Sequence, residues 1–118
     1  MDKALSLLAL ARKGGIAELG EEPVGGAARG GKAYVILVAK DASDHTWRRA
    51  KSFAAGTEQQ CVRLPWTKDQ LGAAIGRDTL AIAAITDVQM ALALVAALPQ
   101  EESNKPALEV LTAKAAKA

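Results

Sequence analysis

Cysteine and histidine are almost absent from this sequence, which contains one of each, Cys61 and His45. A single cysteine cannot form a disulfide bond within the chain, and this pair cannot supply the ligand set of a Cys/His metal site. Nucleophilic catalysis by Cys61 would need a base, and His45 is the sole histidine for that role. A surface histidine and a cysteine packed in a buried strand are the simpler interpretation, so we expect no enzyme activity, no metal and no cofactor.

Long apolar runs are also missing. The most apolar segments, residues 34–39, 79–85 and 88–98, are too short to cross a bilayer, which takes about 20 residues. The first residues lack the apolar stretch and the cleavage site of a signal peptide. We therefore expect a cytoplasmic protein with no membrane partner.

Aromatic residues and strong net charge are scarce in this 118-residue chain. Its aromatic residues are Tyr34, Trp47, Phe53 and Trp66. Half of the residues are hydrophobic, so a single domain can bury a core of Leu, Ile, Val and Ala. The net charge of +2 is uneven, because residues 1–55 hold nine Lys/Arg against six Asp/Glu and residues 56–118 hold six against seven. This excess permits an anionic partner such as nucleic acid but does not require one.

Apolar residues recur with helical spacing in five segments that are bounded by capping or glycine signals. The predicted helices lie at about residues 4–13, 21–29, 41–55, 67–75 and 86–98. Apolar and β-branched runs predict strands at residues 16–19, 34–39, 60–64 and 79–85. Two segments, Thr67–Gln70 and Thr86–Gln89, match a capping box. The alternation of strand and helix favours helices packed on both faces of a largely parallel sheet.

The chain is expected to form one αβα domain over residues 1–99. Residues 100–106 are polar and are interpreted as a linker. The Ala/Lys-rich residues that follow either form a C-terminal helix or remain a loose tail.

A glycine-rich segment from Gly26 to Ala33 has the glycine and lysine spacing of a P-loop, but Ala33 replaces the Ser/Thr that would hold magnesium. The segment also closes a predicted helix and leads into a strand, whereas a P-loop follows a strand and opens a helix. A glycine stop with a solvated Lys32 explains it better. Gly25 and Gly26 lie inside that helix, where each glycine costs about 1 kcal/mol. Two explanations for these glycines remain open: they allow the backbone of a partner to approach closely, or they allow a neighbouring helix to do so.

Two adjacent carboxylates, Glu21 and Glu22, begin the same predicted helix. Neighbouring residues on a helix point about 100° apart, so they do not form an acid–base pair facing one substrate. They do suit the positive end of the helix dipole. No segment of the sequence is typical of an active site.

Several segments occur in an order and spacing that is similar to a known family. They span residues 3–98 and are Leu7–Gly15, Gly20–Glu22, Arg29–Ala33, Val35–Ser43, Thr67–Gly76 and Ala83–Asp87. Together they make the chain resemble the kink-turn-binding ribosomal protein superfamily, of the L-seven-Ae and L-thirty-e type, and within it the small bacterial YlxQ-like branch. The resemblance implies an α/β fold, a three-layer αβα sandwich with a small mixed four-stranded sheet in place of a largely parallel one.

The resemblance also implies recognition of sharply bent RNA. In the family, the N-terminus of the second helix enters the groove at the kink, and a loop before the last core strand, here Arg77–Ala81, packs on flipped-out bases. The helix-two signature Gly-x-Asn-Glu-x-x-Lys keeps its glycine as Gly20. Its Asn, Glu and Lys positions hold Glu22, Pro23 and Gly26.

The preferred function is therefore a non-catalytic protein that binds structured RNA, either a kink-turn or ribosomal RNA, with the ribosome as a candidate partner. The alternative is a protein–protein adaptor that keeps the fold and has lost kink-turn recognition. The residues expected to contact phosphates are Arg12, Lys13, Arg29 and Lys32. The residues expected at the RNA interface are Lys13, Gly20, Glu21, Glu22, Gly26, Arg29, Lys32, Lys40, Asp41, Thr79 and Leu80.

Overall fold

The computed structural model describes residues 2–99 and 101–118. Met1, the first residue of the predicted domain, and Gln100, the first residue of the predicted linker, lie outside the described residues. The helices are α1 (Lys3–Lys13), α2 (Glu21–Arg29), α3 (Asp44–Ala54), α4 (Lys68–Ile75), α5 (Val88–Ala96), a 3₁₀ turn η1 (Glu102–Asn104) and α6 (Lys105–Lys117). The strands are β1 (Ala17–Leu19), β2 (Val35–Val38), β3 (Gln60–Arg63) and β4 (Ile82–Ile85). No helix in this part of the chain is long and apolar enough to cross a membrane.

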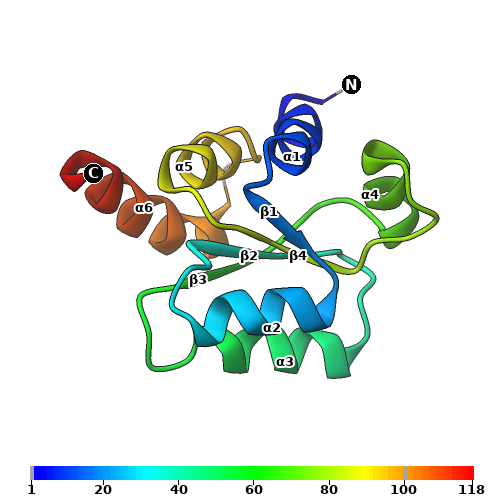
Figure 1. Cartoon of the computed structure of the whole chain (residues 1–118), viewed down its shortest axis with the longest axis horizontal. Coiled ribbons are helices and arrows are strands. Elements are labelled where there is room, and N and C mark those ends of the chain that lie inside the picture. Colours follow the sequence, from blue (N-terminus) through cyan, green and yellow to red (C-terminus); the bar gives the residue numbers. More distant parts are fainter. Residues whose placement is uncertain (1, 100) are drawn as a thin grey trace.

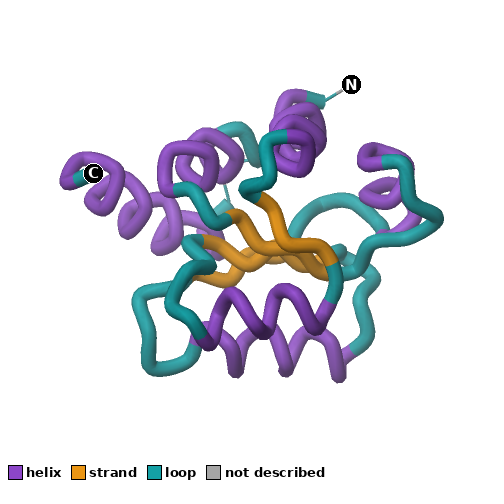
Figure 2. The backbone as a smooth tube through the Cα atoms, viewed as in Figure 1, coloured by secondary structure: helices purple, strands orange, loops and turns teal. Residues whose placement is uncertain are grey.

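The elements form three layers, with the sheet in the middle (Figure 1). Helices α2 and α3 lie side by side on one face of the sheet, and α1, α5 and α6 cover the other face, with α4 beside α1 (Figure 2). This is the three-layer αβα sandwich that the sequence predicts.

The sheet is mixed, and its strand order is β1-β4-β2-β3. Strand β4 is antiparallel to both of its neighbours, β1 and β2, whereas β2 and β3 are parallel. The mixed sheet implied by the family resemblance is confirmed, and the interpretation of a largely parallel sheet is wrong. Alternation of strand and helix does not distinguish the two, because it fixes the order of elements but not the direction in which each strand enters the sheet.

The core is densest around the two central strands. Every residue of β2 and β4 is buried, as the continuous apolar runs in the sequence predict. The edge strand β3 is less covered, and of its residues only Val62 is fully buried. Cys61, predicted to lie in a buried strand, is half-buried because this strand forms an edge of the sheet.

Helix starts follow local sequence signals in most cases. The capping box at α4 is confirmed, since the Thr67 side chain accepts from the Gln70 N–H and the Gln70 side chain accepts from the Thr67 N–H. The second predicted box is wrong by one residue. Helix α5 is capped by Asp87, whose Oδ2 accepts from the Met90 N–H at 2.9 Å. An aspartate at the N-cap makes the same bond as Thr86 would have made.

The C-terminal segment forms the helix α6 rather than a loose tail. Its apolar side packs against α5 and β3, with Ala107 and Leu111 buried. On its exposed side, Lys114 Nζ lies 2.5 Å from Glu58 Oε2, which joins the helix to the turn before β3. The predicted linker contains η1, so the helix begins directly after a short turn.

Close packing of a loop against α4 requires a glycine at position 72. A Cβ atom on Gly72 would lie 2.7 Å from both Asp78 O and Thr79 Cα, which are backbone atoms that cannot swing aside. We predict that Gly72→Ala lowers the free energy of unfolding by about 1–3 kcal/mol, the usual cost of overpacking. Chemical unfolding in urea measures this change.

Gly26→Ala in α2 is the matched control. A Cβ there meets nothing closer than Arg29 Nη2 at 4.0 Å, so the higher helix propensity of alanine should stabilise the protein by about 0.5–1 kcal/mol. Equal stability of the Gly72→Ala variant and the natural protein would contradict the packing argument.

Candidate nucleic-acid interface

Three segments that are far apart in the sequence meet at one end of the sheet. The Gly20 N–H donates to Ile82 O at 3.0 Å, which brings the start of α2 beside the start of β4. The Ala39 N–H donates to Ala81 O at 2.9 Å and brings the turn after β2 to the same place. We call residues 20–22, 40–41 and 77–81 the sheet-end surface. The structure thus brings together seven of the predicted RNA-binding residues: Gly20, Glu21, Glu22, Lys40, Asp41, Thr79 and Leu80.

The N-terminus of α2 leaves backbone donors unused. Gly20 has φ +98°, a conformation that favours glycine, and α2 has no side-chain cap. The Val24 N–H bonds to Gly20 O and Pro23 has no N–H, whereas the N–H groups of Glu21 and Glu22 find no acceptor within residues 2–99 and 101–118. Two such donors at the positive end of a helix dipole suit an anionic group.

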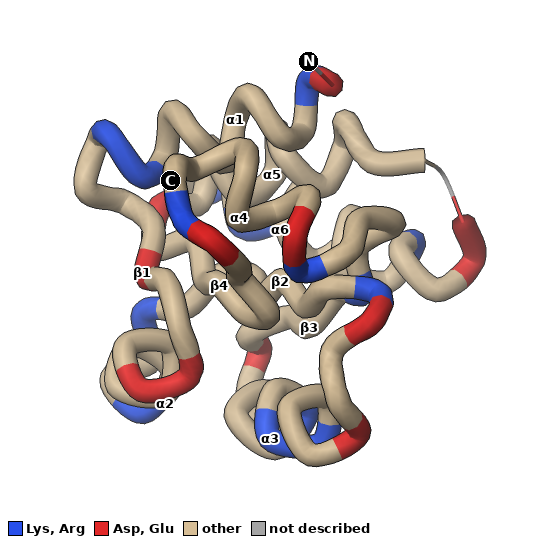
Figure 3. Tube along the Cα trace, turned by 90° about the vertical axis from the view of Figure 1, so that its right-hand side faces the viewer, with Lys and Arg blue, Asp and Glu red and all other residues tan. Residues whose placement is uncertain are grey.

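The two glutamates at this helix end differ in their surroundings. Glu21 Oε1 lies 2.6 Å from Arg49 Nε and 3.9 Å from His45 Nε2, both on α3. The charge of Glu21 is thereby offset by a neighbouring cation. Glu22 is exposed and makes no ion pair with any residue that the structure describes. Figure 3, which faces this end of the molecule, shows acidic and basic segments side by side on α2 and α3.

The two central glycines of α2 serve different purposes. A Cβ atom on Gly25 would lie 3.1 Å from Phe53 Cζ, so Gly25 allows α3 to pack closely, which supports the neighbouring-helix interpretation for this residue. Gly26 is exposed. The guanidinium of Arg29 folds back over both glycines, because its Nη1 lies 3.1 Å from the Cβ position of Gly25 and its Nη2 lies 4.0 Å from that of Gly26. Arg29 therefore brings positive charge to the middle of α2.

The turn after β2 is tied to the start of α4. Asp41 Oδ1 accepts from the Lys68 N–H at 2.8 Å, and the Lys40 N–H donates to Trp66 O at 2.9 Å. Asp41 thus holds two loops together, which is a structural role. The Lys40 side chain is exposed.

The loop before β4 presents one polar side chain and hides one apolar side chain. Thr79 is exposed, while Leu80 is 3% exposed and belongs to the core. The Leu80 side chain is therefore not available to stack on a base, which corrects its expected contact. The sequence favours a strand from Thr79 onward, but the strand begins at Ile82, so both residues lie in the loop. The approach of this loop to Gly72 holds it against α4.

Lys13, Arg12 and Lys32 lie at the opposite end of the sheet. The Thr86 N–H donates to Ile16 O at 2.9 Å, so the chain that follows α1 and its last residue Lys13 reaches the sheet at the far end of β4. Lys32 follows the C-terminus of α2 and precedes β2, also at that end. The sheet therefore separates Lys13, Arg12 and Lys32 from the sheet-end surface. Of the basic residues expected to contact phosphate, Arg29 alone extends back along α2 toward it.

The residues considered for catalysis are not combined into a site. His45 lies beside Glu21 at the start of α3, whereas Cys61 borders a cleft beside β3, and no hydrogen bond joins Cys61 to a base in the part of the chain that the structure describes. Burial raises the pKa of the Cys61 thiol to about 11, against smaller opposing effects of Lys51 and Arg63. Residues 2–99 and 101–118 contain no group of three or more His, Cys, Asp or Glu side chains that could hold a metal.

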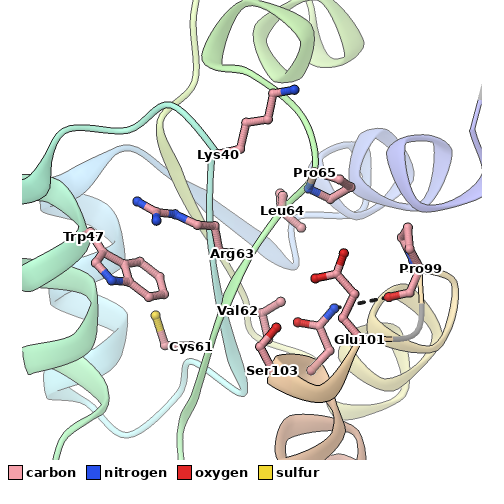
Figure 4. Close-up of a pocket in the computed structure, with 11 residues that line it drawn as sticks. Lys40, Trp47, Cys61, Val62, Arg63, Leu64, Pro65, Pro99, Glu101 and Ser103 are labelled. Carbon is pink, nitrogen blue, oxygen red and sulfur yellow. Dashed lines mark hydrogen bonds between the residues drawn. The ribbon is translucent and has the colours of Figure 1, made fainter.

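The cations over the Trp47 ring were not predicted from the sequence. Trp47 on α3 lies beneath two cations, with Arg63 Cζ 4.7 Å and Lys51 Nζ 5.4 Å from the ring centroid. It borders a cleft of about 460 Å³ beside β3 (Figure 4). The i, i+4 spacing of Trp47 and Lys51 on a helix was a signal for their contact, whereas the contact with Arg63 depends on tertiary packing.

Comparison with known proteins identifies the fold. No family model and no curated protein matches the chain. A solved structure of a protein of unknown function from Bacillus halodurans is similar at 26% identity and a TM-score of 0.76, covering 82% of this chain and 97% of that one. A 15.5 kD RNA-binding protein from Giardia lamblia is similar at 15% identity and a TM-score of 0.61, covering 97% and 86%. The chain has the same fold as these two proteins. That likeness agrees with the fold that the family resemblance implies.

The raised pKa of Cys61 predicts that its thiol is alkylated slowly at neutral pH. At pH 7 a pKa of about 11 leaves about one thiolate in 10⁴, so alkylation by iodoacetamide should be much slower than for a free cysteine of ordinary pKa. The rate should rise tenfold per pH unit from pH 7 to 10, as followed by mass spectrometry. A rate at pH 7 equal to that of an exposed model thiol would contradict the desolvated environment of Cys61.

Proposed function

We propose that this protein binds structured RNA at the sheet-end surface and catalyses no reaction. The observation that carries the proposal is the convergence of the α2 N-terminus, the Lys40–Asp41 turn and the Arg77–Ala81 loop at one end of the sheet. These are the segments that the family resemblance associates with RNA. The Giardia neighbour, described as an RNA-binding protein, supports the same partner.

Backbone donors and one arginine supply the chemistry. The free N–H groups of Glu21 and Glu22 meet a phosphate or a base edge at the helix N-terminus. The guanidinium of Arg29 lies over Gly26, the position where the family signature has a lysine, so it supplies the cation that this signature lacks here. Thr79 and the backbone of the neighbouring loop face unstacked bases.

The preferred target is a kink-turn, in ribosomal or other structured RNA. We infer that the chain belongs to the bacterial YlxQ-like branch of the superfamily, and the Bacillus halodurans neighbour supports a bacterial relative of unknown function. Association with the ribosome and a cytoplasmic location go with this assignment.

A protein–protein adaptor is the second candidate function. Glu22 favours it, because an exposed carboxylate without an ion pair among the described residues repels phosphate at the point where RNA would approach. Pro23 favours it too, since it removes one backbone donor from the first turn of α2. The two functions differ in one observable property, the salt-dependent binding of RNA.

Titration of a kink-turn RNA against salt tests the proposal. We predict binding at about 50 mM salt that weakens linearly in a plot of log affinity against log salt concentration. The variant Arg29→Ala should bind about tenfold more weakly and reduce the slope by about one, since one phosphate contact is lost. Fluorescence anisotropy with a labelled RNA measures both quantities.

Lys32→Ala is the matched control, because it removes the same charge just beyond the C-terminus of α2, where the side chain does not fold back toward the sheet-end surface. It should change the affinity much less than Arg29→Ala. Equal effects of the two variants would mean that only general charge matters and would contradict the assigned interface. Absence of binding even at low salt would favour the adaptor.

A further inference from the structure

The cleft beside β3 runs along the free edge of the sheet. Among the described residues, strand β3 pairs with β2 alone. Residues 61–65, which belong to β3 and the turn after it, all border the cleft. Trp47 of α3 forms one wall, and Pro99, Glu101 and Ser103 form the other, with β3 between them (Figure 4). The cleft is therefore a slot of about 460 Å³ beside the edge strand of the sheet.

Unused backbone donors lie at this edge. The Gln60 and Leu64 N–H groups donate to Tyr34 O and Val38 O at the β2 side. In a parallel pair, alternate residues turn their backbone groups to opposite sides of the strand. The N–H groups of Cys61 and Arg63 therefore face the free edge, and neither has an acceptor in the described part of the chain.

The cations around the cleft are not neutralised by the protein. Lys40 and Arg63 border it, and Lys51 lies over Trp47 one helical turn away. None of the three forms an ion pair with a described residue, in contrast to Arg49 and Lys114, which are paired with glutamates. Glu101 on the far wall is the carboxylate that borders the slot.

Trp47 also fixes two of these cations in space. A guanidinium or ammonium held over an indole ring loses less freedom when it binds a phosphate than a side chain that moves freely in water. The Arg63 guanidinium still has N–H donors to offer, because no hydrogen bond uses them within residues 2–99 and 101–118. This wall is thus a prepared anion-binding surface beside a cleft that polar and apolar residues line together.

We propose that this cleft binds single-stranded RNA. A positively charged groove that contains an aromatic side chain is the arrangement by which proteins follow an unpaired strand. Lys40 belongs both to the cleft and to the sheet-end surface, so an unpaired strand that leaves the structured RNA passes from one to the other. The inference rests on the proposed function in taking RNA as the partner, but it uses separate residues.

The direct probe is a labelled oligouridine about ten nucleotides long, followed by fluorescence anisotropy at low salt. The double variant Lys51→Ala/Arg63→Ala should bind it about tenfold more weakly, with a salt slope reduced by about 1.4 for two lost contacts to a single strand. The double variant Lys3→Ala/Lys117→Ala removes the same charge from α1 and α6 and should bind like the natural protein. Equal weakening by both double variants would overturn the proposal.

Glu101→Gln provides a test by gain of affinity, which misfolding cannot imitate. Removing the negative charge from the far wall should strengthen binding of the oligouridine about twofold to threefold at low salt. Unchanged affinity would place the strand elsewhere and overturn the proposal.

Tryptophan fluorescence locates the strand. In the variant Trp66→Phe, Trp47 is the remaining tryptophan of the chain. Saturating oligouridine should quench its emission, and high salt should restore it. Binding without any change in Trp47 emission would overturn the assignment to this cleft.

A kink-turn RNA without unpaired ends separates this inference from the proposed function. The Lys51→Ala/Arg63→Ala variant should bind it as the natural protein does, since those residues lie outside the sheet-end surface. Binding of this RNA but not of oligouridine overturns the cleft alone. Binding of oligouridine through Lys51 and Arg63, without kink-turn binding, supports the cleft and overturns the kink-turn function. Binding of neither overturns both.

Discussion

The antiparallel insertion of β4 between β1 and β2 is the constraint on which the rest of the molecule depends. Its register pairs Leu19 with Ala83 and Val38 with Ile82, so the strand that comes last in the sequence starts where the two earlier strands end. The loops that follow β1 and β2 must then meet the loop that precedes β4. A parallel β4 would send its preceding loop to the opposite end of the sheet and separate the segments that form the sheet-end surface.

Electrostatics at that surface is balanced between attraction and repulsion. Two backbone donors, the dipole of α2 and the Arg29 guanidinium attract an anion, while Glu22 opposes it. Glu21 contributes little to this repulsion, because Arg49 Nε lies 2.6 Å from its Oε1 and offsets its charge. An exposed pair of this kind contributes little to stability, so its main effect is on the local potential. Trp47 on α3, in the same layer, borders the cleft beside β3. The cations there form no ion pair with a described residue, and Glu101 borders the same cleft.

Features set by neighbouring residues could be predicted from the sequence, and features set by tertiary packing could not. The capping box at Thr67 depends on neighbouring residues and is confirmed. The cap of α5 is Asp87 and not the neighbouring Thr86, because either side chain can accept a hydrogen bond from the first turn of the helix. The burial of Leu80 could not be predicted from the sequence, because the apolar run that contains it does not show where the loop ends and the strand begins. The cleft joins α3 and β3 to Pro99, Glu101, Ser103 and Asn104, and no sequence pattern connects these segments. Of the predicted RNA-binding residues, Lys13 and Lys32 lie away from the sheet-end surface. Their positive charge alone did not indicate where the fold would place them.

The central claim is that structured RNA binds at the sheet-end surface, and amide chemical-shift mapping tests it most directly. A kink-turn RNA with no unpaired ends, added to isotope-labelled protein, should shift and broaden the amide signals of residues 20–26, 40–41 and 77–81. The signals of α5 and α6, on the other face of the sheet, should stay in place. Perturbations concentrated on α5 and α6, with residues 20–22 unchanged under saturating RNA, would contradict the account.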